Sequence, residues 1–227
     1  NFPSPWKQPG PGTIAEGLHA GELKADMTKY NQSYFDTLKQ RVQQVKNHGM
    51  YCSVMFFGSL NGLTTESWNR TLWHPNNNIN SALANAFSTT NGLTFYTTNT
   101  AALDIQKAFI RKTIDTLNDF DHIILEIANE SGGYAEALAW QRKMVDYVIA
   151  YEKTKSKQHI VGITGGGTKW WGTAIQTGNQ QWISPDAGDP AAIQGGVASY
   201  DDKVIINDTD HIQAYTELSE VPAIKKW

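Results

Sequence analysis

The sequence predicts a parallel α/β fold built as one domain over residues 1–227. Short apolar runs alternate with amphipathic helical runs, which is the order of a parallel sheet with crossover helices. Each apolar run is followed by a polar stretch containing Gly, Asn or Ser, as expected where one end of a sheet carries the site. A length of 227 residues suits a single core, and no internal repeat or second domain is visible.

The first elements are a helix, a strand and a long irregular segment. Apolar residues recur at helical spacing over residues 32–48, and Gly49 follows where a helix would stop. Residues 50–57 form a short apolar run that ends at Gly58, which predicts a buried strand. Residues 58–100 have almost no periodicity, so this segment is expected to be irregular and either functional or disordered.

The same alternation continues to the end of the chain. Two more amphipathic helices are expected, at residues 101–117 and 135–155. Four more strands are expected, at residues 122–128, 159–164, 181–184 and 203–208. The expected sheet therefore has five parallel strands.

Composition excludes some classes of partner. The net charge of -3 offers no basic field for nucleic acid, and Lys and Arg are spread along the chain. No apolar run approaches the roughly 18 residues that span a bilayer, so no membrane partner is expected. The only cysteine, Cys52, lies in an apolar run and is interpreted as a structural thiol.

Aromatic and amide side chains are abundant. The chain has 8 Trp, 9 Tyr and 8 Phe beside many Asn, Gly and Thr residues. Such a mixture suits sugars, because rings stack on the apolar faces of pyranoses while amides meet the hydroxyls. A core rich in aromatics would have the same composition, so the choice depends on the site.

The stretch "HIILEIANES", residues 122–131, places two carboxylates on an apparently buried strand. Strand alternation puts Glu126 and Glu130 on one face, with Glu126 the deeper of the two. Burying an unpaired carboxylate is costly, so Glu126 is interpreted as a support residue bonded to an Arg, Tyr or amide of a neighbouring strand. Glu130 is interpreted as the reactive acid; its alternative role is a carboxylate favoured at the start of the next helix.

A second carboxylate is expected at the end of the last strand. The carboxyl ends of parallel strands converge on one mouth, and "KVIINDTDH" brings Asp208 and Asp210 to it. Two carboxylic groups across such a mouth are the minimum equipment for glycoside hydrolysis, since one protonates the leaving oxygen and the other attacks or activates water.

The motif "EIANE" at a strand end is similar to the Asn-Glu signature that closes the fourth strand of clan A glycoside hydrolases, which are (β/α)8 TIM barrels. The chain also resembles cellulase-like bacterial sequences of poorly characterised function. The resemblance covers most of residues 28–211 and depends on four segments that occur in the expected order: "YFDTLKQRVQQVKNHGMYCSVMFF", "HPNNNIN", "RKTIDTLNDFDHIILEIANES" and "VIINDTDH".

This resemblance implies roles and a place in the barrel. Glu130 would be the general acid/base, and Asn129 would hydrogen-bond the substrate's 2-hydroxyl. The five strands would correspond to the third through seventh, so the barrel is apparently incomplete and the chain is interpreted as a fragment, or as one whose sheet edges pair with flanking segments or other subunits. A secreted or periplasmic location in a bacterium is also implied.

One departure from the family concerns the nucleophile. Clan A enzymes place a Glu at the end of the seventh strand, where this chain has Asp208, with Asp210 as the alternative. Asp is one methylene shorter, so the backbone must approach the anomeric carbon to keep the roughly 5–5.5 Å spacing of a retaining pair. A wider spacing would admit water and predict inversion.

Further candidates for substrate contact come from loops and strand ends. His74 and His211 could hydrogen-bond sugar or tune a carboxyl group. Asp-Thr-Asp-His has ligand types that suit a metal, but alternation spreads them over two faces, so no metal and no cofactor are expected. Five tryptophans are candidate sugar platforms: Trp68, Trp73, Trp170, Trp171 and Trp182.

The sequence therefore predicts a glycosidase that degrades a β-linked polysaccharide or oligosaccharide, with Glu130 and Asp208 as the catalytic pair and a retaining outcome favoured. The alternative is a carbohydrate-binding or scaffold protein without turnover on a degenerate barrel.

Overall fold

The computed structural model describes residues 3–58, 65–129, 131, 134–164, 177–184 and 203–206. Within them the chain forms a five-stranded parallel sheet and a separate two-stranded antiparallel ribbon. The sheet strands are β3 (Cys52–Phe57), β4 (Ile123–Ala128), β5 (Val161–Thr164), β6 (Trp182–Ser184) and β7 (Val204–Ile205). The predicted parallel α/β class and all five predicted strands are confirmed.

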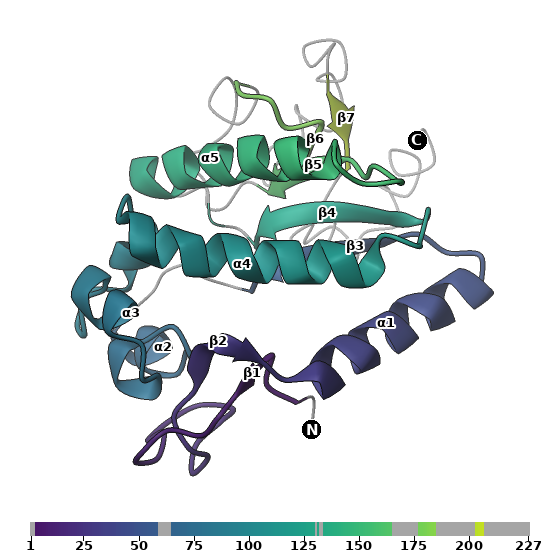
Figure 1. The fold of residues 1–227 in the computed structure, drawn as a ribbon. Coiled ribbons are helices and arrows are strands. Elements are labelled where there is room, and N and C mark those ends of the chain that lie inside the picture. Colours follow the sequence, from purple (N-terminus) through teal and green to yellow (C-terminus); the bar gives the residue numbers. More distant parts are fainter. Residues whose placement is uncertain are drawn as a thin grey trace, which may run out of the picture.

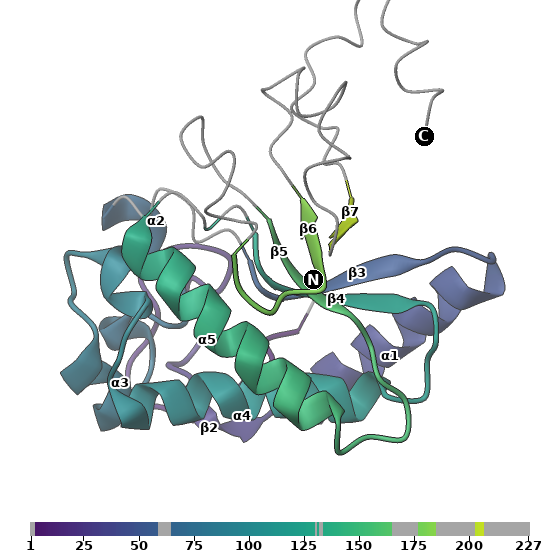
Figure 2. The ribbon, with the colours of Figure 1, turned by 90° about the horizontal axis from the view of Figure 1, so that it is seen from above.

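The strands lie in the sheet in the order in which they occur along the chain, β3-β4-β5-β6-β7. Three long helices accompany them: α1 (Gln32–Asn47), α4 (Thr100–Leu117) and α5 (Ala135–Glu152). Figure 1 shows α4 and α5 running beside the strands, and Figure 2 shows that all three helices lie on one side of the sheet. The described helices therefore cover one face of the sheet.

The three predicted helices are confirmed with small shifts at their ends. α1 buries Phe35 and Val42 and is followed by Gly49, whose φ of 68° lies in the left-handed region that favours glycine. α4 begins where the side chain of Asn99 accepts a hydrogen bond from the backbone N–H of Ala102 at 3.2 Å. α5 ends three residues before the predicted end at residue 155.

The expectation of an irregular segment over residues 58–100 is wrong for its described part. Residues 65–99 contain four short helices: α2 (Thr65–Asn69), η1 (Pro75–Asn77), α3 (Ser81–Ala86) and η2 (Gly92–Phe95). Two of them begin at capping side chains, His74 for η1 and Asn91 for η2. Helices of three to six residues are too short to show a periodic apolar pattern, which is why the sequence did not indicate them.

Aromatic rings join this helical segment to the sheet. The ring of Phe57, the last residue of β3, lies 5.8 Å from Trp73, 5.5 Å from Phe95 and 5.3 Å from Trp140. These centroid spacings are in the favourable range for edge-to-face and tilted pairs. The carboxyl end of β3 is therefore packed in a rigid aromatic cluster.

The antiparallel ribbon β1 (Trp6–Lys7) and β2 (Asp26–Tyr30) was not expected from the sequence. Trp6 packs 5.1 Å from both Trp73 and Phe109. The backbone N–H of Met27 donates to the Asn80 side chain at 2.7 Å. The ribbon is thus held against the helical segment 65–99 and α4.

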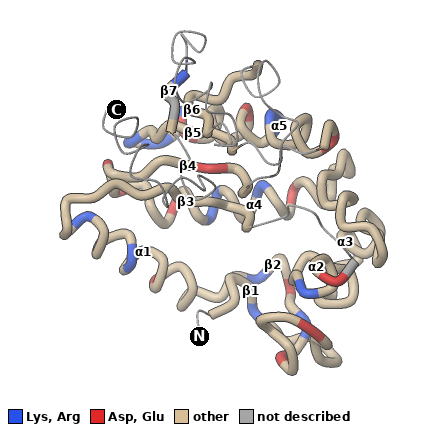
Figure 3. Tube along the Cα trace, turned by 180° about the vertical axis from the view of Figure 1, so that it is seen from behind, with Lys and Arg blue, Asp and Glu red and all other residues tan. Residues whose placement is uncertain are grey.

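Charged residues are scattered over the described chain. Figure 3 shows Lys and Arg positions on several helices and strands, with Asp and Glu positions between them. None of the described helices combines the length and the apolar character needed to cross a bilayer.

Candidate functional site

The carboxyl ends of β3, β4, β5 and β6 lie at one edge of the sheet. Parallel pairing places Phe57 beside Ala128 and Thr164 beside Ser184. One row further in, Met55 pairs with Glu126, and Glu126 pairs with Gly162. Side chains that follow the strand ends are therefore neighbours, as the parallel topology predicts.

Glu126 lies in the middle of β4 and is buried. Its carboxylate accepts hydrogen bonds from the hydroxyl of Ser53 on β3 at 3.1 Å and from the hydroxyl of Thr164 on β5 at 3.0 Å. The Thr164 hydroxyl also lies 3.1 Å from the carbonyl of Ala128. Glu126 thus bridges three neighbouring strands. Two of its partners are hydroxyl groups; the sequence led us to expect a partner among Arg, Tyr and amide side chains, and that expectation stays a prediction.

Asn129 directly follows β4 at the carboxyl edge and is half-buried. Its backbone N–H donates to the carbonyl of Phe57 at 3.2 Å, and its carbonyl accepts from the hydroxyl of Ser131 at 2.9 Å. Both backbone polar groups are therefore engaged. Its side-chain amide, which can both donate and accept, makes no hydrogen bond to the described part of the chain.

Ser131, whose hydroxyl donates to the Asn129 carbonyl, and Tyr96 are both buried. Burial raises the pKa of Tyr96 to about 12, although its hydrogen bond with Ser131 acts in the opposite direction. The phenol therefore stays protonated at physiological pH. Sequence reasoning missed both residues, because Tyr96 comes from the segment without periodicity and no pattern connects it to residue 131.

Three of the predicted tryptophan platforms are core residues. The exposed fractions are 0% for Trp68, 8% for Trp73 and 2% for Trp182. Trp68 donates its indole N–H to the carbonyl of Ser88 at 2.7 Å, and Trp182 donates to the carbonyl of Leu125 at 2.9 Å. Stacking on a sugar requires an open ring face, so the structure corrects this expectation for the three rings.

His74 is also structural. It is buried, and its Nδ1 accepts from the backbone N–H of Asn76 at 3.1 Å while its Nε2 lies 3.1 Å from the carbonyl of Thr89. Both ring nitrogens are engaged by the backbone. The expectation that His74 contacts substrate is therefore corrected, because no nitrogen is left for a sugar hydroxyl.

Six predicted site residues lie outside the described residues. They are Glu130, Trp170, Trp171, Asp208, Asp210 and His211. Their roles stay predictions. In the part of the chain that the structure describes, no group of three or more His, Cys, Asp or Glu side chains is arranged to hold a metal ion.

Comparison with known proteins identifies a family. A family described as a domain of unknown function (DUF6298) matches residues 2–175, about three quarters of the chain. The matched residues include the candidate site at Asn129 and end before β6 and β7. No curated protein matches the chain.

Proposed function

The chain belongs to the DUF6298 family, and we propose that it is a glycoside hydrolase that cleaves a β-linked polysaccharide or oligosaccharide. Glu130 is the proposed general acid/base, Asp208 the proposed nucleophile, and Asn129 the proposed ligand of a sugar hydroxyl. The proposal extends to a secreted or periplasmic location and to a carbohydrate as the partner.

The strand order supports a (β/α)8 barrel as the finer fold. A doubly wound sheet reverses its strand order at a switch point, which places helices on both faces. Here the five described strands follow chain order and the helices lie on one side, as in the wall of a barrel with right-handed crossovers. The inner face of such a wall leads to the carboxyl edge where Asn129 lies.

The single observation that carries the functional proposal is the state of Asn129. Its backbone is fixed on both sides by Phe57 and Ser131, while its side-chain amide, at the carboxyl edge of a parallel sheet, makes no hydrogen bond to any residue that the structure describes. A half-buried amide on a fixed backbone can donate to or accept from a sugar hydroxyl. Glu130 is the next residue in the chain, so acid and amide would serve the same ring.

The chemistry requires one protonated and one ionised carboxyl group. The Glu130 carboxylic acid would protonate the glycosidic oxygen, and the Asp208 carboxylate would attack the anomeric carbon or activate water. Asp210 is the alternative second carboxylate. A retaining outcome is proposed for the shorter carboxyl spacing, and inversion for the wider one.

The decisive experiment compares Glu130→Gln with the wild type on a panel of β-linked glycans. Glu136→Gln is the matched control, because Glu136 is exposed in the first turn of α5 and the chemical change is identical. We expect Glu130→Gln to lose about a hundredfold or more in kcat/KM on natural glycans, and Glu136→Gln to behave as the wild type.

A second substrate tests the role of the acid itself. An aryl glycoside with a strongly acidic phenol needs no protonation on leaving, so formation of the glycosyl-enzyme by Glu130→Gln should be largely preserved on it. Asp208→Asn should lose activity on both substrates, and Asp210→Asn separates the two candidates. Equal activity of wild type and Glu130→Gln on every glycan would refute the proposal that this site is catalytic.

The binding-protein alternative has a distinct outcome. A glycan that binds the wild type without turnover, and whose affinity falls on Asn129→Ala, would identify a carbohydrate-binding protein at the same edge. Isothermal titration of the panel measures this directly.

A further inference from the structure

A recess opens at the amino edge of the sheet, at the other end of the strands from Asn129. Its volume is about 400 Å³, which is within the usual range of small-molecule sites. Parallel pairing sets the beginnings of β3, β4 and β5 side by side there, since Cys52 pairs with Ile123 and Leu125 with Val161. The recess is therefore built by three adjacent strands and the turns before them.

The recess combines apolar side chains with an open aromatic ring. Ile124 and Ile160 line it, and both are half-buried. Tyr51, directly before β3, also lines it and is 77% exposed. Stacking on the apolar face of a sugar requires an open ring face. The described tryptophans are at most 8% exposed, so Tyr51 offers what they do not.

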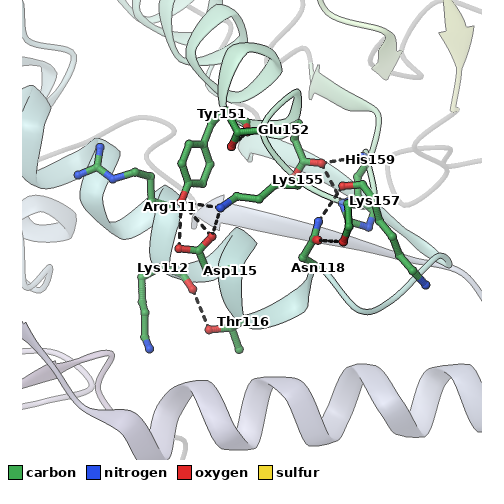
Figure 4. Close-up of polar contacts among 12 residues, drawn as sticks. Arg111, Lys112, Asp115, Thr116, Asn118, Tyr151, Glu152, Lys155, Lys157 and His159 are labelled. Carbon is green, nitrogen blue, oxygen red and sulfur yellow. Dashed lines mark hydrogen bonds and ion pairs between the residues drawn. The ribbon is translucent and has the colours of Figure 1, made fainter.

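The ionised groups of the recess are already paired. The Lys157 ammonium lies 2.5 Å from the carboxylate of Asp121 and donates to the carbonyl of Asp119 at 2.9 Å. His159, which also lines the recess, faces the carboxylate of Glu152 (Figure 4). A phosphate or carboxylate ligand would thus find no unpaired cation among the described lining residues. The pairing favours a neutral ligand.

The polar groups of the recess suit a ligand that carries hydroxyls. The Asp121 side chain is 68% exposed, and a carboxylate has about four acceptor positions, so it can accept more than its bond from Lys157. Gln158 is exposed, and its amide makes no hydrogen bond to the described residues. That amide can both donate and accept. A neutral ligand with an apolar face and a hydroxyl-bearing edge is a pyranose.

We propose that the amino-edge recess binds a pyranose unit of a glycan chain, with the Tyr51 ring as its stacking platform. The class of ligand follows from the recess itself, and the choice of a β-linked glycan rests on the proposed function. Because the recess and Asn129 lie at opposite ends of the strands, the recess holds the chain away from the bond that is cleaved.

Methionine methyl groups report on the recess by NMR. Met50 precedes Tyr51 and is 52% exposed, whereas Met27 and Met144 are buried. The variant Glu130→Gln, labelled with ¹³C-methyl methionine, is titrated to millimolar concentration with cellohexaose, laminarihexaose and xylohexaose. We expect at least one of them to shift the Met50 signal while Met27 and Met144 stay in place. No Met50 shift with any of the three would overturn the inference.

Variants assign the shift to the aromatic ring. Tyr51→Ala should weaken the dissociation constant from the Met50 titration about tenfold or more, and Tyr51→Phe, which keeps the ring, should change it less than threefold. Leu18→Ala is the control, because Leu18 is 73% exposed and lies outside the recess. An affinity unchanged by Tyr51→Ala but reduced by Asn129→Ala would place the glycan at the carboxyl edge and overturn the inference.

Binding at the recess is measured without turnover, so its failure is distinct from that of the proposed function. A Met50 shift that depends on Tyr51, with no turnover of any glycan, would support the recess and count against the enzyme proposal alone. Turnover that depends on Glu130, with no Met50 shift, would overturn the recess alone.

Discussion

A buried ion pair between Glu152 and His159 makes stability depend on pH. Figure 4 shows the two side chains facing each other where α5 ends and the chain turns toward β5. They are 3% and 8% exposed. The carboxylate of Glu152 accepts from the His159 backbone N–H at 2.8 Å and from its Nδ1 at 3.2 Å, while Nε2 lies 2.7 Å from the carbonyl of Phe120.

This geometry requires a charged imidazole. A carboxylate and a carbonyl can only accept hydrogen bonds, so both ring nitrogens of His159 must donate. Burial lowers the pKa of His159, but the bonds to Glu152 and Phe120 outweigh burial and raise the pKa above its usual range. The stabilisation is therefore complete below the ordinary pKa of about 6.5 and is lost as the pH rises through the higher pKa of the folded state.

Glu152→Gln is the sharpest perturbation of this pair. It keeps shape and an acceptor oxygen but removes the charge, which costs about one charge-assisted hydrogen bond, or about 1.5–3 kcal/mol. In a protein of this size that corresponds to a fall of about 3–12 °C in the thermal midpoint. We expect the full difference from wild type near pH 6 and a smaller one as the pH rises through the raised pKa of His159 in the folded protein.

Urea denaturation followed by circular dichroism at several pH values between 6 and 9 measures the difference. Glu136→Gln is the control, because it makes the same chemical change at an exposed position of α5. A gap between wild type and Glu152→Gln that stays constant or widens toward pH 9 would refute the charged-imidazole assignment.

Three further predictions concern the sheet, the ribbon and the thiol. Gly162→Ala should destabilise the protein by about 1–3 kcal/mol in urea denaturation, since an added Cβ would clash with the Trp182 ring. Gly58→Ala is the comparison, because a Cβ there meets no atom of the described residues within 4 Å, and we expect it to be nearly neutral. Burial raises the pKa of Asp26, but its hydrogen bonds lower the pKa by more, so the pKa is depressed in the folded protein. Asp26→Asn should therefore reduce the free energy of unfolding by about 1.5–3 kcal/mol at pH 7. This difference from wild type should shrink as the pH falls below about 4, and a difference that grows would contradict the assignment. Burial raises the pKa of the Cys52 thiol. A colorimetric disulfide reagent at pH 8 should therefore label Cys52 more slowly in native protein than in protein unfolded by urea. Equal labelling rates would contradict the raised pKa.

Sequence periodicity was sufficient for the long elements. Helix α4 buries one face along its length, and strand β4 is a continuous run of mostly buried residues. Both patterns can be recognised in the local sequence. The Asn-Glu pair after β4 was recognisable for the same reason, because a strand end can be located once its apolar run is known. The internal role of Glu126 also followed from its position within that run.

Periodicity in the sequence could not indicate the short helices of residues 65–99, nor could it show which tryptophans are buried. An indole can stack on a sugar or fill a core, and the residue type is the same in both cases. Trp68 and Trp182 are buried, and the carbonyls of Ser88 and Leu125 accept hydrogen bonds from their indole N–H groups. Those partners are 20 and 57 residues away along the chain, so only the folded arrangement reveals them.

The sequence by itself determined the alternation of helices and strands, the parallel sheet and the placement of Asn129 at its carboxyl edge, because each depends on local spacing. Tertiary structure alone decided that Ser53 and Thr164 hold Glu126 and that the three long helices cover one side of the sheet. These contacts join residues far apart in the chain, and their energies depend on burial and geometry that exist only once the layers have packed.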